Sequence, residues 1–199
     1  MNYLYDRELV LRTRFNNSVH ALLGVPQVDY YSRLSIDQVL ELKATLSDIN
    51  NIVTLRLAVS LGEWICNRFN LPSSKLKEIG ETISASKPNA NGYDLELHDP
   101  NIIAEVKCNI PINGGNAYGA QQRDGLIRDI KGLLNGKSKS ARDISNSVKL
   151  LALYDAATVR NASKRLVHNL PQELNKRIVI DPQEDRKLDS MSVFIIYLK

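Results

Sequence analysis

The chain has 199 residues, of which 43% are hydrophobic and 24% are charged, and its formal net charge is +4. This length and balance favour one soluble globular domain, with or without a helical appendage, over a fibrous or disordered protein. No apolar run approaches the length of a membrane span, and the charged N-terminal stretch has no signal-peptide core. We therefore expect a cytoplasmic protein with no membrane partner.

The cysteines and histidines exclude two further classes of protein. Cys66 and Cys108 stand in apolar surroundings, and His20, His98 and His168 are scattered along the chain. We expect two reduced cysteines, with neither a disulfide framework nor a zinc site.

Basic residues gather in two segments. Residues 123–142 contain six basic residues against Asp124 and Asp129, and residues 160–177 contain five against Glu173. Two such segments favour a polyanionic partner. A solvated surface is the alternative for either segment.

Residues 1–50 predict helices without a catalytic signature. Apolar residues recur at helical spacing between positions 4 and 23, and Gly24-Val25-Pro26 ends that pattern. Ser35 is a suitable N-cap for a second helix that runs to about Ser47. We assign residues 1–50 to a helical extension packed on the core, with dimerisation or DNA contact as the other possible role.

The next segment, residues 51–69, is the most apolar helix candidate. Its polar residues Arg56, Ser60, Glu63 and Asn67 fall on one narrow stripe. The simplest interpretation is that this stripe faces solvent. After it we expect a loop over residues 70–77, a strand over residues 79–86 that Gly80 weakens, and a tight connection over residues 88–92.

Residues 92–108, GYDLELHDPNIIAEVKC, predict two short strands joined by a turn at Asp99-Pro100-Asn101. Successive strand residues point to opposite faces, so Glu105 and Lys107 share a face with Ile103. We do not expect the hairpin to place Asp94 directly opposite Glu105 unless the strands bend or splay.

Charged residues in the second of these strands point to chemistry. A Glu and a Lys inside an otherwise apolar strand are costly unless they are satisfied. Two neighbouring carboxylates, Asp94 and Glu105, repel each other, and Mg²⁺ with its preference for oxygen ligands relieves that repulsion. Lys107 can then stabilise an attacking hydroxide or the pentavalent phosphorus. A metal ion and an ammonium group together favour phosphodiester cleavage.

The remaining chain alternates helices and strands. We expect a Gly- and Asn-rich loop at 109–118, a helix at 120–134, a basic loop at 135–140, strands at 148–154 and 193–198, a helix at 158–170 and a short apolar piece at 177–180. From residue 51 the order is helix, three strands, helix, strand, helix, strand, which favours an α/β fold.

The spacing of Asp94, Glu105 and Lys107 resembles the PD-(D/E)xK nuclease superfamily, which includes most type II restriction endonucleases. Tyr93 stands where the motif usually has proline, and the resemblance covers about residues 51–154. It implies a restriction-endonuclease-like core over residues 51–199, with a mixed central sheet flanked by helices.

The resemblance also implies a function. The protein would be an Mg²⁺-dependent endonuclease, with Mn²⁺ as a substitute, cutting a short specific site in double-stranded DNA in a prokaryotic cytoplasm. Asp94, Glu105 and the carbonyl group of Val106 would bind the metal ion, Lys107 would act on the attacking water or the transition state, and Glu63 would hold a metal-bound water. Cutting both strands implies a homodimer. The candidates for DNA contact are Asn109, Asn113, Asn116, Gln121, Gln122, Arg123, Lys137 and Lys139.

Three other interpretations remain open at this stage. A junction resolvase or repair nuclease would keep the chemistry and change the substrate. A protein of the same fold could bind DNA without cutting it, although the intact Asp94, Glu105 and Lys107 argue against this. Finally, the pattern could be incidental in an unrelated α/β protein.

Overall fold

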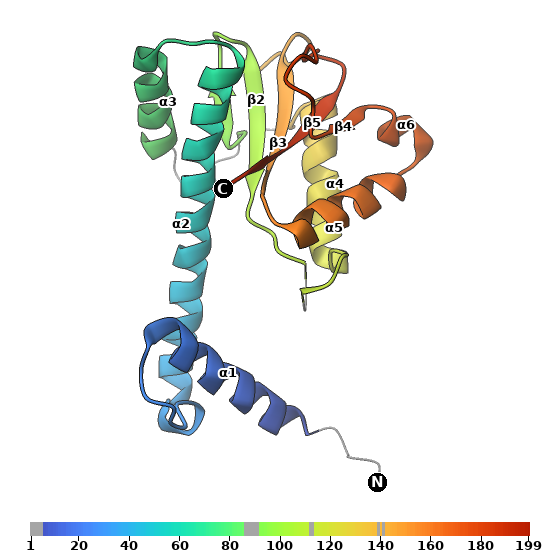
Figure 1. Ribbon diagram of the computed structural model, residues 1–199. Coiled ribbons are helices and arrows are strands. Elements are labelled where there is room, and N and C mark those ends of the chain that lie inside the picture. Colours follow the sequence, from blue (N-terminus) through green and yellow to red (C-terminus); the bar gives the residue numbers. More distant parts are fainter. Residues whose placement is uncertain (1–5, 86–91, 112–113, 139, 141) are drawn as a thin grey trace. The chain divides into compact units, whose positions relative to one another are not determined.

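The computed structural model describes residues 6–85, 92–111, 114–138, 140 and 142–199 (Figure 1). The chain divides into two compact units, Met1–Ile49 and Asn50–Lys199. The division falls next to the predicted limit of the N-terminal extension at residue 50.

The first unit contains helix α1 (Arg7–Leu23), the 3₁₀ helix η1 (Tyr31–Arg33) and the beginning of helix α2 (Ile36–Arg68). Asp6 caps α1 through its side chain, and Gly24 ends the helix with a left-handed backbone at φ 63°. No residue of this unit is buried within the described range 6–49. Its apolar side chains therefore remain available to a partner.

Helix α2 corrects the prediction of two separate helices. It runs unbroken from Ile36 to Arg68. The junction between the two predicted helices, at Asn50-Asn51, contains no glycine or proline that would stop the helix. Its buried residues begin only at Leu57. The predicted strand at residues 79–86 is also wrong, since helix α3 covers Ser73–Ala85. Ile79 and Ile83, four residues apart, form the buried side of α3.

The second unit is built on a five-stranded mixed sheet in the order β1-β2-β3-β5-β4. Strand β1 is antiparallel to β2, and the other neighbours are parallel. The strands span Leu95–Leu97 (β1), Ile102–Lys107 (β2), Val148–Tyr154 (β3), Ile178–Ile180 (β4) and Val193–Leu198 (β5). The predicted α/β class with a mixed sheet flanked by helices is confirmed.

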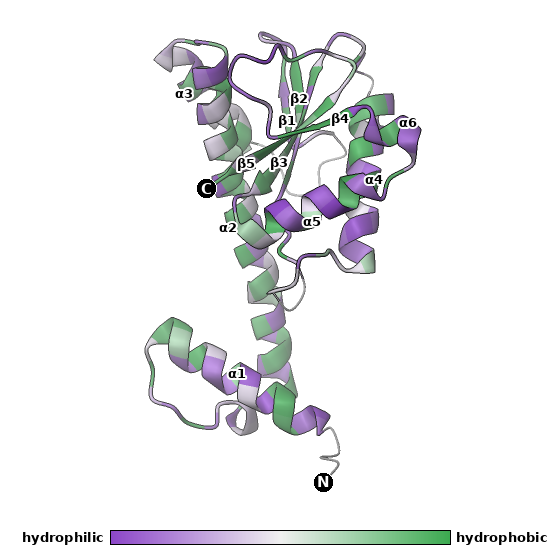
Figure 2. Ribbon diagram, turned by 45° about the vertical axis from the view of Figure 1, so that its right-hand side comes forward, coloured by the Kyte–Doolittle hydropathy of each residue, from purple (hydrophilic) through white to green (hydrophobic). Residues whose placement is uncertain are grey.

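Helices cover both faces of the sheet (Figure 1). One core joins the C-terminal half of α2 and α3 to the sheet, and the other joins the sheet to helices on its opposite face. These helices are α4 (Ala120–Asn135), α5 (Ala157–His168) and the short α6 (Gln172–Asn175). Figure 2 shows the strands as mainly hydrophobic, as expected when both faces are covered. Full burial of each large aliphatic side chain contributes about 1.5–3 kcal/mol.

The segment after α4 is fastened to the sheet by two basic side chains. Arg142 donates hydrogen bonds to the carbonyl group of Leu97 and to Asn101 Oδ1, the latter at 2.7 Å. Lys149, in β3, is 2% exposed and donates hydrogen bonds to the carbonyl groups of Ile144, Ser147 and Ser190. The Arg142 bonds hold residues 142–147 against the hairpin of β1 and β2, and the Lys149 bonds hold them against β3.

Candidate active site

The hairpin brings Asp94 next to Glu105, and the expectation that it would not was wrong. Leu95 pairs with Ala104, so the register continues to Asp94 opposite Glu105. A turn centred between Asp99 and Pro100 gives this register without any splaying. The Val106 N–H donates a hydrogen bond of 2.7 Å to Asp94 Oδ2, which fixes the carboxylate beside β2.

Lys107 joins the two carboxylates. Its Nζ lies 3.4 Å from Asp94 Oδ2 and 3.2 Å from Glu105 Oε2. Alternation along β2 puts Glu105 and Lys107 on the face of the sheet that α4 covers, together with Ile103. The prediction that Ile103, Glu105 and Lys107 share a face is confirmed. The charged residues of the motif, Asp94, Glu105 and Lys107, form one cluster.

Two further charged side chains complete the cluster. Asp129 of α4 lies 3.6 Å from Lys107 Nζ through its Oδ2 atom. Lys137, just after α4, lies 2.5 Å from Glu105 Oε1 through its Nζ atom. The cluster therefore holds three carboxylates and two ammonium groups, and a small excess of negative charge attracts a cation.

These side chains line a cleft of about 630 Å³ in the second unit. Asp94, Glu105, Lys107, Asp129 and Lys137 all contribute to it, and α2 supplies part of the opposite wall. From α2 come, among others, Asn51, Thr54 and Ala58. The cluster is thus open to a ligand rather than enclosed in the core, although Glu105 at its floor is only 1% exposed.

The surroundings shift the pKa values of Glu105, Asp129 and Lys107. Burial, and then repulsion from Asp94, raises the pKa of Glu105 above its usual value. Burial likewise raises the pKa of Asp129, although Lys107 opposes the change. For Lys107, burial lowers the pKa, but Asp94, Asp129 and Glu105 together outweigh burial and raise it above the usual 10.5. Lys107 is therefore a cation in this arrangement, suited to stabilising negative charge.

The donor set suits a hard divalent cation. Asp94 and Glu105 present carboxylate oxygens to the cleft. Val106, which stands between Glu105 and Lys107 in β2, also lines the cleft. Glu105 Oε1 is buried and accepts no hydrogen bond of ordinary geometry from any described residue. A buried carboxylate oxygen without a hydrogen bond is a candidate metal ligand. In the described ranges, however, no three His, Cys, Asp or Glu side chains form a ready-made metal site.

Glu63 is not brought to this site. Its side chain is exposed on α2, and the part of α2 that lines the cleft ends at Ala58. Glu63 therefore lies on the solvent stripe that the helical spacing also allowed.

The predicted DNA-contacting residues are scattered. Asn109 lines the cleft, and Lys137 is paired with Glu105. Gln122 is tied into its own loop, because its side chain accepts a hydrogen bond from Gly119 N–H and donates one to the Ile110 carbonyl group. Gln121 is exposed at the start of α4. Asn113 and Lys139 lie outside the described residues.

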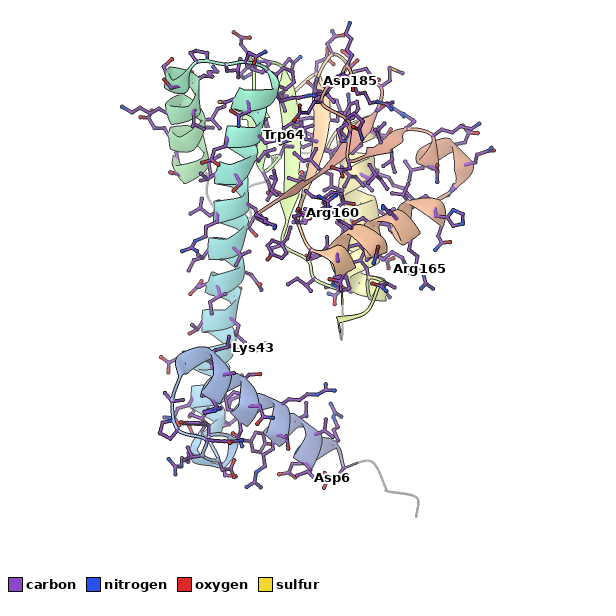
Figure 3. All side chains as sticks on the ribbon, in the orientation of Figure 1. Asp6, Lys43, Trp64, Arg160, Arg165 and Asp185 are labelled. Carbon is purple, nitrogen blue, oxygen red and sulfur yellow. The ribbon has the colours of Figure 1, made fainter. Side chains whose placement is uncertain are left out.

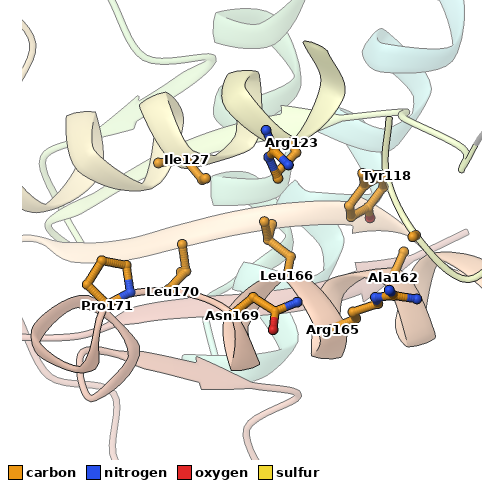
Figure 4. Close-up of a pocket in the computed structure, with 10 residues that line it drawn as sticks. Tyr118, Arg123, Ile127, Ala162, Arg165, Leu166, Asn169, Leu170 and Pro171 are labelled. Carbon is orange, nitrogen blue, oxygen red and sulfur yellow. The ribbon is translucent and has the colours of Figure 1, made fainter. Parts of the chain in front are cut away.

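Asn116 and Arg123 lie near a second pocket, of about 430 Å³, between α4 and α5. Figure 4 shows Arg123 on the α4 side of this pocket and Arg165 on the α5 side. Arg165 and Arg160 are also labelled on α5 in Figure 3. Asn116 accepts a hydrogen bond of 3.2 Å from Asn161 Nδ2, which links the loop to α5.

Asp129 is the site residue that the sequence analysis missed. It follows Leu126 by three residues and precedes Leu133 by four, so it lies on the buried stripe of α4. A carboxylate on such a stripe must find a buried partner, and this signal could have identified it.

No membrane-spanning helix is found in the described part of the chain, since none is both long and apolar enough. Comparisons with known proteins gave no match: no family model matches the sequence, and no curated protein or solved structure is significantly similar to it. The function is therefore argued from the geometry of the cleft.

Proposed function

We propose that this protein is an Mg²⁺-dependent endodeoxyribonuclease of the PD-(D/E)xK type, acting as a type II restriction endonuclease on a short duplex site. One observation carries the proposal: Asp94 and Glu105 meet at the Lys107 ammonium group at the edge of an open cleft. The support comes from this site and not from strand order, because α3 replaces one of the three strands expected before α4.

Each residue has a distinct role in this proposal. Asp94, Glu105 and the Val106 carbonyl group would hold the cation. When bound, the cation lowers the pKa of an attacking water and neutralises charge on the phosphate group. Lys107 places a permanent positive charge where the phosphorane develops negative charge. Asp129, 3.6 Å from Lys107 Nζ, holds that ammonium group in place.

Exposed basic side chains on α4 and α5 support a DNA substrate. Helices α4 and α5 cover the same face of the sheet as the charged cluster, and they carry arginines and lysines that can contact phosphate groups. These exposed residues are Arg123, Arg128, Lys131, Lys164 and Arg165. Such contacts position DNA without reading its sequence.

Incubation of the purified protein with unmethylated phage DNA tests this function. In Mg²⁺ or Mn²⁺ we expect discrete fragments on a gel, and in EDTA we expect intact DNA. A metal-dependent smear, or cutting confined to branched DNA, would favour a repair nuclease or a junction resolvase instead. Intact DNA with every substrate would contradict the nuclease assignment.

We further propose that the enzyme works as a homodimer, since two sites are needed to cut both strands of a duplex. The first unit supports this, because it buries none of its described residues and exposes leucines and isoleucines. Leu40, Leu46 and Ile49 are examples on α2.

Sedimentation of the full chain tests the dimer. We expect a dimer at micromolar concentration, and we expect the double variant Leu46→Lys, Ile49→Lys to be monomeric and to nick one strand of DNA. The matched change Lys43→Ala, at an exposed position of the same helix, should leave the dimer intact. A wild-type monomer that cuts both strands at once would refute the dimer.

A further inference from the structure

The Lys137 ammonium group lies in the cleft beside Glu105. Its Nζ lies 2.5 Å from Glu105 Oε1 and donates a hydrogen bond of 2.7 Å to the Gly92 carbonyl group. It also lies 5.0 Å from the centre of the Tyr93 ring, within the range of a cation–π contact. Lys137 is therefore held by three groups, and only the first of them carries a charge.

Glu105 divides its two oxygens between two lysines. Oε2 lies 3.2 Å from Lys107 Nζ, and Oε1 lies 2.5 Å from Lys137 Nζ. The Oε1 atom accepts no hydrogen bond of ordinary geometry from the described residues, so the Lys137 contact is an ion pair. Since Glu105 is almost fully buried, it needs this countercharge to remain ionised.

A divalent cation bound by Glu105 would compete for the same oxygen. Mg²⁺ binds carboxylate oxygen at about 2.0–2.1 Å, which is closer than the ammonium group lies now. Two cations at such distances from one oxygen repel each other strongly inside a protein, so a divalent cation bound at Oε1 weakens the Lys137 contact. The carboxylates also do not converge as a ready-made metal site in the described ranges.

We propose that Lys137 is a displaceable counter-ion: its ammonium group neutralises Glu105 in the metal-free protein and leaves Oε1 when a divalent cation binds. This inference rests on the proposed function, because it assumes that Glu105 binds a metal ion. Lys137 follows Gly136, lies at the partly exposed wall of the cleft and needs only side-chain rotation to leave. Once displaced, its charge is free to pair with a DNA phosphate group entering the cleft.

Binding of Mn²⁺, measured by isothermal titration calorimetry without DNA, tests the exchange. The variant Lys137→Gln removes the competing charge but keeps a donor for the Gly92 carbonyl group. We expect it to bind Mn²⁺ at least about tenfold more tightly than the wild type, which corresponds to about 1.4 kcal/mol. Lys131→Gln, the same charge change at an exposed position of α4, should leave the affinity unchanged.

A second variant keeps the test decisive if Lys137→Gln fails to fold. Lys137→Arg retains the charge and can hold the carboxylate through two hydrogen bonds, so we expect Mn²⁺ to bind more weakly than in the wild type. Equal Mn²⁺ affinity in the wild type and the Lys137 variants would overturn the exchange, even if the protein cuts DNA. Tighter binding in Lys137→Gln without any DNA cleavage would support the exchange and overturn only the nuclease function.

Discussion

Replacing Lys107 with alanine is expected to lower the rate of Mg²⁺-dependent DNA cleavage about 10²- to 10³-fold, as the loss of one preorganised charge at a developing anion does. The ammonium group lies within 3.6 Å of three carboxylates, and no other lysine contacts Asp94 among the described residues. Cleavage of a plasmid under single-turnover conditions measures the loss.

The fold should survive this substitution. Lys107 is partly exposed at the end of β2 and belongs to neither apolar core. Its removal leaves Asp94, Glu105 and Asp129 with less countercharge, so we expect a lower melting temperature that added Mg²⁺ partly restores. Lys187→Ala, at an exposed position outside the helices that cover the site, is the matched control and should cut at the wild-type rate. Wild-type cleavage by Lys107→Ala would refute the assigned site.

Replacing Lys149 with alanine is expected to lower the free energy of unfolding by about 3–4 kcal/mol, a large effect for one residue. The side chain is 2% exposed in the central strand β3, and its ammonium group binds three carbonyl groups. Alanine would leave both a cavity and unpaired carbonyl groups at one end of the sheet. Urea denaturation measures the change, and Lys164→Ala, which alters an exposed lysine on α5, should change it by less than about 0.5 kcal/mol.

The contribution of Lys149 to the free energy of unfolding should increase with pH. Burial is the main reason that the pKa of Lys149 lies below its usual 10.5. In the unfolded chain Lys149 has its usual pKa of 10.5, and in the folded protein its pKa is lower. At pH values between these two, the unfolded chain binds more protons than the folded one, so raising the pH stabilises the fold. Relative to Lys149→Met, the wild type should therefore gain stability as the pH rises from neutral towards 10.5. A difference in unfolding free energy that stays constant with pH would contradict the lowered pKa of Lys149 in the folded protein.

Strong apolar runs made most of the sheet predictable. Residues 102–107, 148–154 and 193–198 are rich in apolar residues, and each forms a strand as expected. The strand predicted over residues 79–86 was wrong because Ile79 and Ile83 fit a buried helix face as well as a strand. A segment this short has too little hydrophobic periodicity to decide between the two. The single long α2 was missed because two apolar helices with a polar junction resemble one continuous helix.

Only the site residues that lie close together in the sequence could be predicted. Asp94, Glu105 and Lys107 belong to one hairpin, so their sequence spacing determines their meeting. Asp129 and Lys137 reach the cleft through the packing of α4 on the sheet. The stripe of α4 marks Asp129 as a buried carboxylate, but no local pattern gives the partner that it meets. The superfamily resemblance assigned Glu63 to the metal site, but the helical stripe on which Glu63 lies faces solvent.

The most direct test of a metal-dependent nuclease at Asp94, Glu105 and Lys107 is a comparison of plasmid cleavage by the wild type and by Asp94→Asn in the same Mg²⁺ buffer. Asparagine keeps the shape of the side chain and can still accept the hydrogen bond from Val106 N–H. We expect the wild type to cut and EDTA to stop it, while Asp94→Asn binds DNA but cuts at least about 10²-fold more slowly, since it loses a carboxylate ligand of the cation. Cleavage by Asp94→Asn at the wild-type rate, or wild-type cleavage in EDTA, would contradict the assigned site.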